Sequence, residues 1–190
     1  MPRVLIVCAS VAALLSTSCG GGDGEDGTFP LSKPVVCVST ANDPDDIGLR
    51  GTRLQLVDDG IEVTWTTAGP VRSTPGGSFD VELVDEYGIR RGGLSLNLWD
   101  EELAAIFGQD YSADVESLRL LDSEPVDGKP TIAGRTVTMV YPHSAIEAED
   151  RTHWRAFVGA HVGGQDRDDW CPDPSPGDEK PEPLRMPTAN

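Results

Sequence analysis

The chain has 190 residues, of which 32 are acidic and 15 basic, and its formal net charge is −17. This acidity argues against nucleic acid or an anionic membrane surface as a partner, because both need clustered Lys and Arg. Apolar residues are spread through the middle of the chain, which excludes a wholly disordered protein. The length fits one domain with appendages at its ends.

Residues 1–18 have the composition of an export signal. Arg3 precedes an apolar run over residues 4–15, and the small residues 16–18 follow it. As a helix this run would span about 18 Å, which is too short for a bilayer core of about 30 Å. We therefore expect residues 1–18 to be a signal peptide that is absent from the mature protein.

Cys19 follows the signal directly, and residues 20–27 are Gly and acidic residues only. Small residues, a cysteine and a Gly-rich tether resemble the lipobox of bacterial lipoproteins, with Ser16 at the position where that motif favours Leu. The resemblance implies cleavage before Cys19, acylation of Cys19, a flexible tether over residues 19–32, and an extracytoplasmic membrane anchor. In a host with an outer membrane, the anchor would lie there. The alternative is an ordinary secretory signal that leaves Cys19 as a free thiol.

Two further cysteines, Cys37 and Cys171, remain in the exported chain. An oxidising compartment makes a disulfide between them the default. In the chain-entropy model, closing so long a loop stabilises the fold by about 4–5 kcal/mol. The bridge would mark a domain over residues 33–172, and residues 173–190, rich in Pro and acidic residues, are predicted to be a disordered tail.

Within the domain, short segments of alternating apolar and polar residues predict β-strands. In chain order they cover residues 54–57, 61–66, 79–83, 94–99, 103–107, 136–141 and 154–160. A turn at residues 58–60 joins the first two as a hairpin, and residues 142–147 could form one short helical turn. Strands at this spacing without crossover helices predict an all-β fold, an antiparallel two-sheet β-sandwich.

The order of these elements resembles the β-sandwiches of family-9 carbohydrate-binding modules and DOMON-type domains. An acidic segment at residues 45–47 precedes the hairpin that contains residues 56–65. Residues 135–146 form a strand followed by Pro and a short helix, and Trp-Cys-Pro at 170–172 closes the domain. The resemblance implies the sandwich fold and a ligand that is a sugar, haem or only structural calcium.

The sequence offers no reacting group in a recognisable arrangement. The three histidines, His143, His153 and His161, form no metal-binding helix motif, and no serine lies in a Gly-x-Ser-x-Gly segment. We therefore predict no catalytic residues and a protein that is not an enzyme.

Two acidic segments flank the cysteines and could share a structural calcium ion, the one candidate cofactor. If the disulfide forms, it draws them together, and Ca²⁺ takes six to eight oxygen ligands. The alternative, which we favour, is a pair of ordinary solvated turns. The candidate ligands are Asp43, Asp45, Asp46, Asp166, Asp168 and Asp169.

The tryptophans divide into two groups. Alternation places Trp65 and Trp154 in the core, whereas Trp99 shares a face with Ser95 and Asn97. An exposed Trp beside polar groups is how a sandwich stacks on a sugar ring, so these three residues are the candidate glycan-binding set. The alternative is a Trp covered by a neighbouring loop.

Together these features predict a lipid-anchored protein of the cell envelope with a non-catalytic binding or structural domain. Its partners would be the membrane, through the anchor, and a glycan or an envelope protein, but no nucleic acid. The alternative function is a protein-interaction or assembly factor that acts through its acidic surface and has no small ligand.

Overall fold

The computed structural model describes residues 33–40, 48–71, 77–99, 102–109, 122–146, 150–162 and 165–186. Within these ranges the chain is built from strands, with one short 3-10 helix, η1 (His143–Ala145). The strands are β1 (Val35–Val38), β2 (Leu49–Val57), β3 (Gly60–Thr67), β4 (Gly77–Val84), β5 (Arg90–Trp99), β6 (Glu102–Gln109), β7 (Asp122–Pro125), β8 (Thr131–Ala133), β9 (Thr136–Tyr141), β10 (His153–Val162), β11 (Gln165–Cys171) and β12 (Leu184–Arg185).

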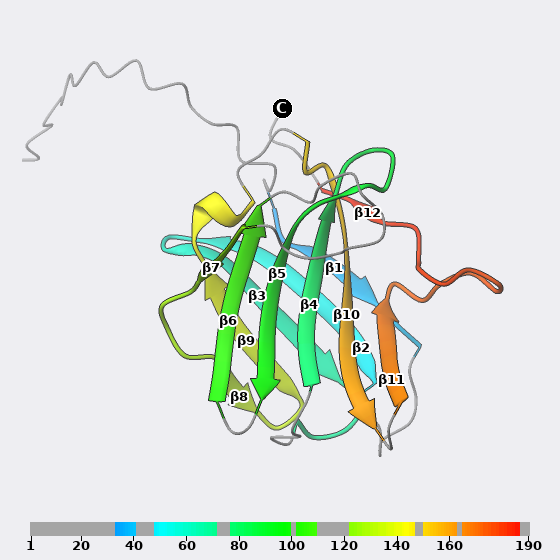
Figure 1. Ribbon diagram of the computed structural model, residues 1–190, viewed down its shortest axis with the longest axis horizontal. Coiled ribbons are helices and arrows are strands. Elements are labelled where there is room, and N and C mark those ends of the chain that lie inside the picture. Colours follow the sequence, from blue (N-terminus) through cyan, green and yellow to red (C-terminus); the bar gives the residue numbers. More distant parts are fainter. Residues whose placement is uncertain are drawn as a thin grey trace, which may run out of the picture.

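The strands form two antiparallel sheets that lie face to face as two layers (Figure 1). One sheet has the order β1-β2-β3-β9-β8. The other has the order β11-β10-β4-β5-β6-β7, and the two-residue strand β12 pairs with β10 as well. The predicted all-β, two-sheet antiparallel sandwich is therefore confirmed, as is the predicted hairpin, which is β2 and β3.

Alternation along the strands explains how the two layers meet. On β3, the side chains of Ile61, Val63 and Trp65 are fully buried, while the residues between them are half-buried on the other face. The ring of Trp65 packs against Phe79 of the opposite sheet, with their centroids 5.8 Å apart. Trp154 is also fully buried, so both tryptophans assigned to the core are there.

The segment after Cys171 departs from the prediction. Residues 173–186 do not form a disordered tail, because they lie against the sandwich and end at a buried methionine, Met186. Its backbone N–H bonds the carbonyl of Thr152, and β12 pairs with the end of β10. The ordered domain thus extends to residue 186, and only residues 187–190 of the predicted tail lie outside the described part.

Candidate functional site

The disulfide between Cys37 and Cys171 is present, as predicted. The two sulfurs are 2.08 Å apart and the Cα atoms 5.8 Å apart, and both residues are buried. Because Cys37 is on β1 and Cys171 on β11, the bond ties together the edge strands of the two sheets. It therefore holds this side of the sandwich closed.

The segment next to the disulfide strengthens the same junction. The carboxylate of Asp173 accepts a hydrogen bond from the Ser39 hydroxyl at 2.5 Å and others from the backbone N–H and hydroxyl of Thr40. Desolvation acts to raise the pKa of Asp173, but these hydrogen bonds outweigh it and hold the pKa below its ordinary value. The C-terminal segment thus binds back to the two residues that directly follow β1.

The candidate glycan-binding set is only partly described, and one member is misplaced. Ser95 is buried, with 6% of its surface exposed, so its prediction as a surface ligand is wrong. It lies opposite Asp80 of β4 and hydrogen-bonds that buried carboxyl group, which accounts for its burial. Asn97 is half-buried, and the side chain of Trp99 lies outside the described part.

The candidate calcium ligands are not brought together among the described residues. Asp43, Asp45 and Asp46 lie outside them, as does the side chain of Asp166. The acidic segment before Cys171 is a strand, β11, rather than a loop, so Asp168 and Asp169 project to opposite faces. Asp169 accepts a hydrogen bond from the Leu49 backbone N–H at 2.5 Å.

No group of three or more His, Cys, Asp or Glu residues in the described ranges has the spacing of a metal site.

A buried ion cluster lies on the face of β4 and β10 that points away from the core. Glu82 is 2% exposed, and its carboxylate lies 2.8 Å from Arg155, 3.4 Å from Arg90 and 3.5 Å from Lys180. Arg155 also donates to the backbone carbonyl of Pro181 at 3.0 Å. Because Lys180 and Pro181 come from the C-terminal segment, this cluster fastens that segment onto the sheet.

The same segment covers Trp170. The ring of Trp170 packs on Phe157 with a centroid distance of 4.5 Å, and the charged ends of Arg155 and Lys180 each lie 5.4 Å from its centroid. Trp170 precedes Cys171 in β11, so the two side chains project to opposite faces of the sheet. Its place under two cations makes it structural.

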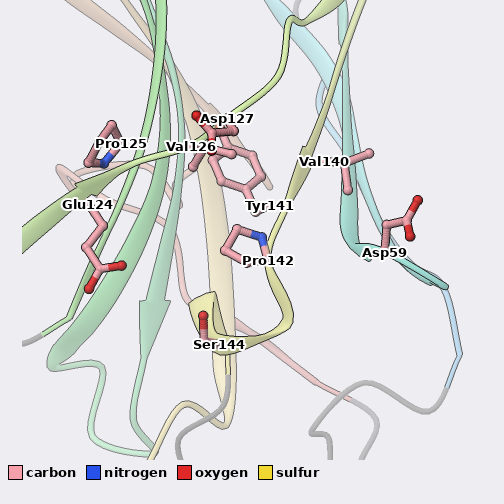
Figure 2. A pocket seen from close by; sticks show the side chains of 9 residues that line it. All are labelled: Asp59, Glu124, Pro125, Val126, Asp127, Val140, Tyr141, Pro142 and Ser144. Carbon is pink, nitrogen blue, oxygen red and sulfur yellow. The ribbon is translucent and has the colours of Figure 1, made fainter.

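An acidic hollow of about 520 Å³ lies where η1, the β2–β3 turn and the segment after β7 approach one another (Figure 2). Three exposed carboxylates line it, those of Asp59, Glu124 and Asp127. None of the ion pairs found among the described residues involves them.

The backbone of the β2–β3 turn explains how Asp59 reaches this place. Gly60 has φ +154° and lies so close to β9 that a Cβ atom would come within 1.9 Å of the Tyr141 carbonyl oxygen. Only glycine allows this approach, which brings the preceding Asp59 to the edge of β9.

Residues with apolar surface also line the hollow. Val126, Pro142 and Tyr141 line it, and Figure 2 shows the Tyr141 ring among these residues. The Tyr141 hydroxyl is buried and has no hydrogen-bond partner. Burial, and to a smaller degree the charge of Asp80, raises the pKa of Tyr141 well above its ordinary value, so the hydroxyl keeps its proton.

The comparisons with known proteins add no relative. No protein-family model, curated protein sequence or solved structure matches this chain significantly. Cys19, the predicted lipidation site, lies outside the described residues. Of the residues that are described, none belongs to a helix long and apolar enough to cross a membrane.

Sequence reasoning missed the hollow and the ion cluster for the same reason. Asp59 and Asp127 belong to turns that read as ordinary solvated turns, and Glu82 looks like the outward residue of an alternating strand. One signal was available: charged residues lie within or at the start of strands that otherwise hold mostly apolar or small residues, namely Asp80, Glu82, Arg90, Arg91 and Arg155. Charges on strands in this pattern indicate a face that something else covers.

Proposed function

We propose that this protein is a lipid-anchored, non-catalytic binding module on the extracytoplasmic side of the bacterial cell envelope. The lipobox-like segment before Cys19 and the Gly-rich residues that follow it support the anchor and a flexible tether. In a host with an outer membrane, the anchor belongs to that membrane, because Gly20 rather than Asp follows Cys19.

The Cys37–Cys171 disulfide is the observation that carries the export half of this proposal. Both sulfurs are buried and within bonding distance, and buried structural disulfides belong to oxidising compartments. The disulfide also joins β1, the first strand after the Gly-rich residues, to β11, which suits a domain held at its N-terminal end by an anchor.

For the binding half, we propose that the partner is an envelope protein that meets the acidic surface. The formal charge of −17 and the three carboxylates of the hollow, Asp59, Glu124 and Asp127, support this choice. A glycan remains the second candidate through Asn97 and Trp99, although the burial of Ser95 removes one of its three expected contacts.

Fractionation of the cell envelope tests the anchor. Cys19→Ser moves the protein from the membrane fraction to the soluble fraction, while the matched change Cys8→Ser, inside the signal, leaves it in the membrane. Retention of the Cys19→Ser protein in the membrane would contradict the lipid anchor.

Cross-linking in intact cells tests the partner. If the acidic surface binds an envelope protein, its cross-links weaken as salt rises and are unaffected by Trp99→Ala. A glycan-binding protein behaves in the opposite way, since it loses polysaccharide binding in Trp99→Ala and keeps its melting temperature.

A further inference from the structure

We propose that residues 180–186, called here the docked peptide, exchange between two copies of this chain, so that each docks on the other copy with the turn at residues 175–178 as the hinge. The inference goes beyond the proposed function, because it needs neither the lipid anchor nor an envelope partner. It rests on how the docked peptide contacts the domain, on the exposed loop that connects the two, and on one glycine in that loop.

The docked peptide contacts the domain as a separate bound peptide would. Its strand β12 pairs with the first two residues of β10, next to the stretch that β11 occupies, while β4 pairs along the other edge. The Lys180 ammonium lies 3.5 Å from the Glu82 carboxylate. The Met186 side chain is buried, and its backbone N–H bonds the Thr152 carbonyl at 2.8 Å. Strand addition, an ion pair and an apolar anchor are contacts that the docked peptide of a second copy can make equally well.

The residues between β11 and the docked peptide form an exposed loop. Figure 1 shows the orange-red chain after β11 running out beyond the edge of the sheet, reversing and returning to β12. Residues 175–179 are all exposed, and the backbone N–H of Asp178 bonds the Ser175 carbonyl at 2.9 Å to close the turn. Such a loop changes its path without loss of core packing, because its side chains already lie in water.

Gly177 decides whether this loop turns back. Its φ of +97° lies in the left-handed region, which residues with a side chain adopt only at a cost. Pro176 precedes it, as in turns that take Pro at the second position and Gly at the third. Among the described residues, a Cβ atom at position 177 would meet nothing within 4 Å, so the conformation and not the space requires glycine. With a negative φ at this residue the turn opens, and the docked peptide is directed away from its own β10.

The exchanged dimer keeps every contact of the docked peptide. Asp173 stays on its own copy, bound to Ser39 and Thr40, so the exchange begins after this residue. Residues 174–179 span up to about 20 Å when extended, which gives the docked peptide length to reach a neighbouring copy. Both docking surfaces are filled in a two-fold dimer, so the assembly closes at two copies. The repulsion between two chains of net charge −17 is screened beyond about 8 Å at physiological salt.

Two full-length chains with one new cysteine each test the exchange directly. His153→Cys is made in one chain and Arg185→Cys in a second chain of larger size, because these residues lie opposite each other in the β10–β12 pairing. Both chains also carry Cys8→Ser and Cys19→Ser, so the new thiol is the only free one. Neither chain can form the bond alone. After mixing and mild oxidation, we expect a covalent heterodimer on a non-reducing gel, and its absence would overturn the proposal.

A matched pair measures random collision between exposed thiols. Glu182→Cys replaces Arg185→Cys in the larger chain, since Glu182 is also exposed but does not pair with His153. Because docking raises the effective concentration of the paired thiols only, we expect about tenfold less heterodimer from this control mixture. Equal yields from the two mixtures would show collision without docking and would overturn the proposal.

Gly177→Val tests the hinge in the otherwise unchanged chain. The left-handed conformation costs a residue with a side chain enough to shift the equilibrium about tenfold per hinge, and the dimer contains two hinges. By light scattering, we therefore expect the dimer at a protein concentration about 100-fold lower than in the parent. The control Ser175→Val adds the same side chain at an exposed position of the same turn and should behave like the parent. A Gly177→Val chain that stays monomeric, even with a lower melting temperature, would overturn the exchange, because its docked peptide would then have left the surface without entering a second copy.

Discussion

Arg155 on β10 and Glu82 on β4 lie directly opposite each other on neighbouring strands, and the Nε atom of Arg155 is 2.8 Å from the Glu82 carboxylate. Both side chains are largely buried on the face of the sheet that points away from the core. Arg90 and Lys180 complete the cluster from β5 and from the C-terminal segment. One buried carboxylate thus joins three separate parts of the chain.

Glu82→Gln removes this charge while keeping the shape of the side chain. Arg155 is then left buried without its anionic partner, and we expect the free energy of unfolding to fall by about 3 kcal/mol. Chemical denaturation at neutral pH measures the change. The control Glu86→Gln alters an exposed carboxylate and should stay within about 0.5 kcal/mol of the parent. Similar losses in both variants would mean that Glu82 contributes only through the net charge.

The Cys37–Cys171 disulfide is expected to stabilise the fold. Replacing Cys37 and Cys171 by serine frees a loop of 134 residues in the unfolded state, and in the chain-entropy model this costs about 4–5 kcal/mol. We expect a large fall in the melting temperature, and the same fall in the parent under reducing conditions. Cys19→Ser is the matched control and should melt like the parent. An unchanged melting temperature in the double variant would contradict a stabilising role for the bond.

Removal of the C-terminal segment tests the corrected domain boundary. A chain that ends after Pro172 loses the hydrogen bonds of Asp173, the Pro181 carbonyl that Arg155 binds, and the buried side chain of Met186. Loss of the methionine alone costs about 1.5–3 kcal/mol of apolar burial. We expect a lower melting temperature and faster proteolysis. A chain that ends after Met186 keeps all these contacts and is the control. Equal proteolysis of the two chains would contradict the docked segment.

We expect the buried carboxyl group of Asp80 to make the stability of the fold decrease as pH rises. Burial raises its pKa, although Ser78, Ser95 and Arg90 partly oppose the shift. A raised folded-state pKa contributes stability below the unfolded value of 3.8, and that contribution is lost as pH rises through the folded value. Asp80→Asn is therefore expected to raise the melting temperature at neutral pH, with a gain that shrinks on acidification. A variant that is less stable at pH 7 would contradict this assignment.

The contribution of Asp173 to stability should change with pH in the opposite direction to that of Asp80. Its hydrogen bonds from Ser39 and Thr40 lower its pKa in the folded state, so its contribution is present above the unfolded value of 3.8 and is lost as pH falls through the folded value. Asp173→Asn is expected to cost about 1 kcal/mol at neutral pH, a value that allows for its exposure to solvent. Melting curves at neutral and acidic pH measure the difference, which should narrow in acid. The same difference in melting temperature between parent and variant at both pH values would mean that the charge of Asp173 does not contribute to stability.

The sequence by itself determined the fold class and the principal strands. Period-two alternation at Ile61, Val63 and Trp65 predicts a half-buried strand wherever that strand lies, because alternate side chains share a face. The pairing of Cys37 with Cys171 was also predicted from the sequence, on the expectation that Cys8 is removed with a signal peptide and Cys19 is acylated. These properties depend on local spacing and on chemistry alone.

Only the tertiary structure decided which polar and charged residues are buried and which distant segments are in contact. Ser95 and Glu82 occupy outward positions in their strands, yet both are covered. Met186 is buried in the core because β12, which precedes it, pairs with the first residues of β10. No local sequence pattern indicates this pairing. The acidic hollow likewise needs Asp59 and Asp127, 68 positions apart in the chain, at one place. Contacts between distant segments depend on how the sheets pack, and hydrophobic alternation carries no information about them.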